Sequence, residues 1–238
     1  INFEKSLSRD FGSLNIGVIK NIEKLGISED VINAYETSKT VLTGLGHKLI
    51  EVDFSELSSG ICSYYVIAPA ECSSNLSRFD GVKYGYRSEG EKDIANLYMN
   101  TRSDGFGDEV KKRILIGTHV LSAGFYDAYY LQAQKVRRMI KVKFEDFFKD
   151  VDLIFMPTTL DQAFEKNRKS DDPNRMYKED LLTIPANLAG LPAISFPNGF
   201  KNNLPIGGQL IGKYFGEDLL LNTTNKIQEV TDWHKMTP

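Results

Sequence analysis

The 238-residue chain has few of the residues that form covalent cross-links and metal centres: two cysteines and three histidines. Cys62 and Cys72 lie ten residues apart, a spacing that fits no metal or redox motif. We therefore expect two buried thiols in a reducing cytoplasm. The histidines are scattered through the chain, which disfavours a histidine-based metal site; they are His47, His119 and His234.

The chain also lacks long apolar runs and an excess of positive charge. No apolar segment approaches the length of a membrane span, and no signal peptide opens the chain. A net charge of -3, with 41% hydrophobic and 26% charged residues, argues against an avid nucleic-acid binder. This composition is still compatible with a protein that passes nucleic acid to a partner. Because the first residue is Ile1 and not Met, we expect a piece of a longer protein.

The first 54 residues predict a β-α-β unit. Apolar and polar residues alternate over residues 14–19, as in a half-buried strand. Ser28 can cap a helix that Gly46 ends, and residues 48–54 return to a strand. The two strands should be parallel. No glycine-rich phosphate loop follows the first strand, so a nucleotide-binding fold is not supported.

The remaining chain predicts further alternation of helices and strands, which indicates a single α/β domain over residues 1–238 with a mixed sheet flanked by helices. Strands are expected at residues 151–156, 193–196 and 208–211, and charged or glycine-rich loops at 80–90 and 166–174. Single helices are expected at residues 61–78, 91–102, 176–188 and 217–230. Pro69 should kink or restart the first of these, and Pro185 should interrupt the third. A pair of helices is expected between residues 108 and 148, with Asp108 as the cap of the first helix and a break at Ser122-Ala123-Gly124.

The segment 105–137 carries the most suggestive chemistry. A basic cluster, Lys111-Lys112-Arg113, precedes an aromatic run over residues 125–130. Aromatic rings beside a guanidinium suit a pocket for a small molecule with a carboxylate. The same pattern fits an amphipathic helix pair, in which Arg113 would belong to a solvated face.

Other candidates have equally ordinary readings. Asp180 fits an exposed helical acid, and Tyr64 fits a core aromatic whose hydroxyl is hydrogen-bonded. The pair Ser73-Ser74 lacks the glycine-rich turn that exposes a catalytic serine, so we expect polar residues near a helix end. The basic run over 135–143 fits a solvated helix face. The residues by themselves show no complete catalytic constellation.

Several segments together resemble one family, the A subunits of glutamyl-tRNA(Gln) amidotransferases. The resemblance extends from about Phe3 to the end of the chain. It rests on long blocks: YYVIAPAE at 64–71, SSNLSRFDG at 73–81, the segment 105–137, DDP at 171–173, PANLAGLP at 185–192 and DWH at 232–234.

The resemblance implies the C-terminal portion of the amidase signature fold, so that residues 1–238 would be half of one amidase domain. The family's Ser, cis-Ser and Lys triad would lie upstream, and the chain alone would be inactive. The family enzyme hydrolyses glutamine and passes ammonia to its B subunit. That second polypeptide uses ATP and Mg²⁺ to amidate Glu-tRNA(Gln), and in many bacteria Asp-tRNA(Asn), while a C subunit fastens the two larger ones together. No cofactor is implied for this chain, and mischarged tRNA would be reached through the B subunit.

The resemblance also assigns substrate-binding roles. Arg113 matches the arginine that binds the glutamine α-carboxylate, and Asp180 matches the acid that binds its α-ammonium. Tyr64 matches a tyrosine beside the same substrate. A guanidinium binds a carboxylate through two parallel bonds, and a carboxylate is a natural partner for an ammonium. Two residues depart from the family pattern. Gly208 stands where the family usually has a larger apolar residue, and Asn198 stands where it often has cysteine. We expect both departures to affect core packing.

Two alternatives remain beside this reading. One is a non-catalytic binding or interaction module on an amidase scaffold. The other, a general amidase with a different substrate, is disfavoured because Arg113 and Asp180 occur together. A sheet without its other half would expose strand edges and apolar surface, so we also expect self-association or only marginal stability.

Overall fold

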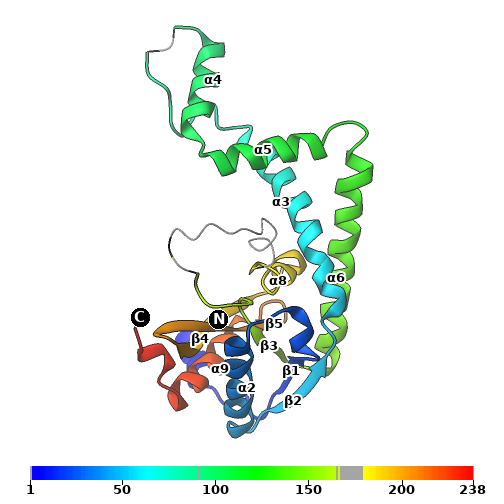
Figure 1. Cartoon of the computed structure of the whole chain (residues 1–238), viewed down its shortest axis with the longest axis vertical. Helices are drawn as coiled ribbons and strands as arrows, with labels where there is room; N and C mark the ends of the chain where they lie inside the picture. The colour runs from blue at the N-terminus through cyan, green and yellow to red at the C-terminus, as the bar shows by residue number, and fades with distance from the viewer. Residues whose placement is uncertain (1, 91, 165, 167–178, 238) are drawn as a thin grey trace. The chain divides into compact units, whose positions relative to one another are not determined.

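The computed structural model describes residues 2–90, 92–164, 166 and 179–237, which are drawn in colour in Figure 1. The chain forms two compact units. Unit 1 comprises residues 1–61 and 137–238, and unit 2 comprises residues 62–136. That the two units belong to one amidase domain stays a prediction.

A five-stranded mixed sheet forms the centre of unit 1 (Figure 1). Its strands, in spatial order, are β2 (Lys48–Val52), β1 (Asn15–Ile19), β3 (Leu153–Pro157), β5 (Leu204–Gly212) and β4 (Ala193–Lys201). β1 is parallel to both β2 and β3, whereas β5 is antiparallel to β3 and β4. All five residues of β3 are buried, as expected for a central strand covered on both faces. The predicted mixed sheet and the parallel first pair are confirmed.

Helices α2 (Glu29–Gly44) and α9 (Glu217–Val230) pack against the strands of this sheet (Figure 1). Tyr35 of α2 is fully buried, and its hydroxyl accepts a hydrogen bond from the Ile19 amide at 2.8 Å. Its ring stacks on Phe155 of β3 at 5.2 Å. This one side chain therefore fixes α2 to two neighbouring strands. The shorter elements of the unit are α1 (Phe3–Leu7), η1 (Ile22–Leu25), η2 (Ser55–Ser59), α8 (Ile184–Ala189) and η4 (Trp233–Lys235).

The hairpin of β4 and β5 is longer than the predicted strands. Residues 197–199 look like a strand end in the sequence, but they form a register shift and the pairing continues beyond it. The turn is made by Asn202 and Asn203, both in the left-handed region at φ 52° and 63°. Asparagine tolerates this conformation better than other side chains with a Cβ, and two such residues suit a tight hairpin turn.

Unit 2 is built from helices. It contains most of α3 (Gly60–Leu76), all of α4 (Ile94–Gly105) and α5 (Asp108–Val120), the π-helical turn η3 (Tyr126–Tyr130) and the start of α6 (Leu131–Asp150). The break after α5 is confirmed, and Gly124 adopts φ 88° there. α3 continues through Pro69, so the helix does not restart at that residue.

Helices α3 and α5 approach each other backbone to backbone. A Cβ added at Gly117 would lie 1.9 Å from the Pro69 carbonyl oxygen, so only glycine fits at this contact. Close by, the hydroxyls of Ser73 and Thr118 lie 2.8 Å apart. Ser73 thus lies near the end of a helix, as predicted, and its hydroxyl has a structural partner.

Some predictions were wrong. Cys62 is exposed and Cys72 half-buried, because helical unit 2 leaves much of α3 open to solvent. Gly107, not Asp108, is the N-cap of α5. Pro185 lies in the first turn of α8, where its missing N–H costs nothing, so it does not interrupt that helix. The predicted loop beyond Lys166 and the start of the predicted helix at 176–178 lie outside the described residues.

Candidate functional site

Arg113 lies in the second turn of α5 and is held by two side chains. Its Nε donates to Glu109 Oε1 at 3.2 Å, one turn earlier on the same helix. The Tyr64 side chain lies close enough to interact with the guanidinium. The hydrogen bond to Glu109 and, after it, the interaction with Tyr64 raise the pKa of Arg113 above its usual value. The side chain is 39% exposed, so the guanidinium stays accessible to a ligand.

Tyr64 comes from the second turn of α3 and is half-buried. Its ring packs edge-to-face on Tyr65, with the centroids 5.1 Å apart. The structure therefore brings together two of the three residues that the sequence assigned to the substrate. Glu109 occupies the Nε–H of Arg113, and the guanidinium has four further N–H groups on its two terminal nitrogens. These groups suit a carboxylate ligand.

Asp180 lies in unit 1, in the turn that leads into α8, and is half-buried. Its backbone carbonyl accepts from the amides of Thr183 and Ile184 at 3.2 and 3.0 Å. Arg113 and Tyr64 belong to unit 2. A common site that contains all three residues therefore stays a prediction.

The basic run on α6 is only partly a solvated face. Lys135 and Arg138 are exposed, as predicted. Arg137 instead donates from Nε to the Leu188 carbonyl oxygen at 2.9 Å, and Lys143 lies 3.4 Å from Glu56. These contacts give part of the run a structural role within unit 1.

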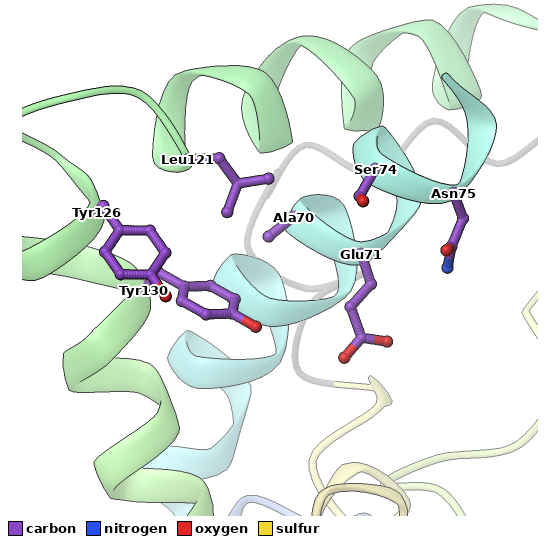
Figure 2. Close-up of a pocket in the computed structure, with 7 residues that line it drawn as sticks. All are labelled: Ala70, Glu71, Ser74, Asn75, Leu121, Tyr126 and Tyr130. Carbon is purple, nitrogen blue, oxygen red and sulfur yellow. The ribbon is translucent and has the colours of Figure 1, made fainter. Parts of the chain in front are cut away.

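Unit 2 contains a pocket whose place the sequence did not predict, and we call it the tyrosine pocket (Figure 2). Its volume is about 400 Å³. The aromatic run of the sequence pointed to a pocket, but for a ligand beside Arg113. The lining includes neither Arg113 nor Tyr64; its described residues are Ala70, Glu71, Ser74, Asn75, Leu121, Tyr126 and Tyr130.

Among the residues that the structure describes, no three His, Cys, Asp or Glu side chains are placed to hold a metal ion. None of the described helices combines the length and the apolar character that crossing a membrane requires.

The chain matches the family model for amidases over residues 2–221. It is 50% identical to the A subunit of the glutamyl-tRNA(Gln) amidotransferase of Hahella chejuensis and 49% identical to that of Coxiella burnetii. Each alignment covers the whole of this chain and 49% of the relative. The chain thus spans about half the length of the curated relatives it matches.

Solved structures agree with these sequence matches. The A subunit of the glutamyl-tRNA(Gln) amidotransferase of Thermotoga maritima superposes with a TM-score of 0.73 at 35% identity, over 98% of this chain and 46% of that one. A 6-aminohexanoate cyclic dimer hydrolase shares the fold, with a TM-score of 0.75 at 21% identity over 99% of this chain and 49% of that one. The predicted amidase fold and the resemblance to the A subunits of these amidotransferases are confirmed. Since the family model matches nearly all of it, the chain belongs to the amidase family.

Proposed function

We propose that this chain is the glutamine-recognising part of the A subunit of a tRNA-dependent amidotransferase. The complete protein would hydrolyse glutamine and supply the ammonia that converts Glu-tRNA(Gln) to Gln-tRNA(Gln). The identity of 50% over the whole chain to such a subunit supports this assignment. The observation that carries glutamine recognition is the contact of Tyr64 with Arg113.

The proposed recognition follows from the charges of a free amino acid. Arg113 binds the α-carboxylate through its terminal N–H groups while Glu109 holds the Nε edge. Asp180 binds the α-ammonium, and Tyr64 lies beside the bound substrate. A peptide or a simple amide lacks one or both of these charges, so the pair selects free glutamine.

The chemical step belongs to residues outside this chain. The family's Ser, cis-Ser and Lys triad has no match in it, so we assign it no catalytic residue. The B and C subunits of the amidotransferase are the proposed partners, and the B subunit would handle ATP, Mg²⁺ and mischarged tRNA. The free thiols of Cys62 and Cys72 fit a cytoplasmic location.

Glutamine hydrolysis by the complete gene product, compared with that of the 238-residue chain alone, tests this proposal. We expect the complete protein to release ammonia from glutamine and the chain alone to release none. Hydrolysis by the purified chain would contradict the assignment of the chemistry to another segment. A complete protein that binds its partners but never hydrolyses glutamine would support a non-catalytic module instead.

A further inference from the structure

The described residues that line the tyrosine pocket all belong to unit 2 and come from three segments. Figure 2 shows the rings of Tyr126 and Tyr130 directed from η3 toward α3, with Leu121 at the end of α5. Leu121 is 36% exposed and gives the pocket an apolar surface, and the buried Ala70 also lines it. A few polar groups placed beside such a surface are the usual composition of a small-molecule site.

Three polar side chains of α3 line the pocket: Glu71, Ser74 and Asn75. Within the described part of the chain, none of the three has a side-chain hydrogen bond or an ion pair. Glu71 supplies two acceptor oxygens, and the Ser74 hydroxyl and the Asn75 amide can each donate or accept. The pocket therefore holds three polar groups of one helix that are available to a ligand.

The tyrosines have a defined arrangement. Their rings stack with centroids 5.1 Å apart and planes inclined by 30°. The Tyr130 hydroxyl accepts a hydrogen bond from Gln134 Nε2 at 2.9 Å, which orients the ring. Such rings present a negative face that attracts cations.

The charge of the lining decides the kind of ligand. Among the described residues that line the pocket, Glu71 is the only ionisable one apart from the tyrosines, and none is basic. An anion would meet an uncompensated carboxylate, and a divalent metal would find one carboxylate where it prefers six or more oxygen ligands. An ammonium group has the charge that the Glu71 carboxylate can pair with, and its N–H groups can donate to the polar side chains of α3.

We propose that the tyrosine pocket binds a primary alkylammonium group. Its charge lies between the Glu71 carboxylate and the tyrosine rings, and its alkyl chain lies on Leu121. This site is separate from Arg113 and does not rest on the proposed glutamine function. A failure of either proposal therefore leaves the other unaffected.

Titration of the 238-residue chain with n-butylammonium chloride, followed by ¹H–¹⁵N NMR, tests the proposal. We expect saturable shifts of the amides of residues 70–75 and 121–130. Uncharged n-butanol has the same alkyl chain and should produce much smaller shifts. Absence of saturable shifts, or equal binding of n-butanol, would overturn the proposal.

Variants identify the groups that bind. Glu71→Gln keeps the shape of the side chain and should weaken n-butylammonium binding by about fivefold, since charge-assisted bonds in exposed sites are of modest strength. Glu89→Gln removes the same charge from an exposed position of unit 2 outside the pocket and should leave binding unchanged.

A second pair of variants tests how much the ring of Tyr126 contributes to n-butylammonium binding. Tyr126→Leu should weaken binding by about threefold, whereas Tyr126→Phe keeps the ring and should bind like the parent. Tyr126 is 40% exposed, so both variants should fold. Unchanged binding by both Glu71→Gln and Tyr126→Leu would sink the proposed site, as would equal weakening by Glu89→Gln.

Discussion

Gly117 of α5 contacts the backbone of Pro69 in α3, and an added Cβ would lie 1.9 Å from the Pro69 carbonyl oxygen and 2.5 Å from its carbonyl carbon. Backbone atoms cannot move aside as the end of a flexible side chain can. Arg113 lies one helical turn before Gly117, and Tyr64 lies five residues before Pro69. The close crossing of the two helices therefore brings Arg113 to Tyr64.

Gly117→Ala should consequently destabilise unit 2, although alanine favours helices. Forced overpacking costs about 1–3 kcal/mol, and contact with backbone puts this substitution at the upper end. Urea unfolding followed by circular dichroism measures the loss. Gly44→Ala is the control: nothing lies within 4 Å of its added Cβ, and it should leave stability unchanged or raise it by up to about 1 kcal/mol. Parental stability of Gly117→Ala would contradict the backbone contact.

Asn198 and Gly208, the two departures from the family pattern, face each other across β4 and β5. An added Cβ at Gly208 would lie 3.1 Å from the Asn198 amide group and from the Phe155 ring. The absence of a side chain at Gly208 therefore makes room for Asn198. Asn198 is 1% exposed, and neither atom of its amide has a hydrogen-bond partner among the described residues.

Because an unpaired buried amide is unfavourable, Asn198→Val should raise the free energy of unfolding by about 1 kcal/mol. Asn222 provides a matched control, since it is also buried but donates to three backbone carbonyls at 2.9 Å each. Asn222→Val should lower stability by about 1–3 kcal/mol. Urea unfolding of both variants measures the difference, and a clear loss of stability in Asn198→Val would show that its amide is satisfied.

His47 makes the folding stability of the protein depend on pH. Its Nδ1 accepts a hydrogen bond from the Leu14 amide at 3.2 Å, just before β1. Burial lowers the pKa of His47 below the ordinary 6.5. Only the neutral ring can accept this bond, so the unfolded chain takes up the proton more readily than the folded chain. The stability that His47 contributes is present above pH 6.5 and is lost as pH falls through the lower folded pKa.

Unfolding free energies measured at about pH 7.5 and about pH 5.5 should therefore differ more in the parent than in His47→Asn. The Asn side chain offers an acceptor oxygen in a similar place but has no proton to gain in this range. The other histidines are common to both proteins, so their effects cancel in the comparison. Equal pH dependence would refute a role for His47.

The sequence predicts the local elements of this fold better than their pairing. The amphipathic pattern over 217–230 coincides with α9, and the alternation near 14–19 coincides with β1. Local pattern could not show that residues 197–199 form a bulge within a continuing hairpin, because that depends on the partner strand. It also misjudged Cys62, whose exposure depends on how few elements cover α3.

For the candidate site too, the sequence predicts local contacts better than contacts between helices. The four-residue spacing of Glu109 and Arg113 on a helix is readable from the sequence. The contact of Tyr64 with Arg113 requires the crossing at Gly117, which no local pattern indicates. Likewise, the aromatic run of residues 125–130 signalled a pocket, but the tertiary fold places it with Glu71 and not with Arg113.

The glutamine KM of the complete amidotransferase carrying Arg113→Ala is the sharpest test of glutamine binding by Arg113. Loss of a charge-assisted contact with the α-carboxylate, about 1.5–3 kcal/mol, should raise KM by roughly ten- to a hundredfold. Stability should change little, since the ion pair with Glu109 is solvent-exposed. Lys112→Ala removes the neighbouring charge, which lies 4.0 Å from the same Glu109, and should leave KM unchanged. An unchanged KM in Arg113→Ala, or an equal rise in Lys112→Ala, would contradict the account.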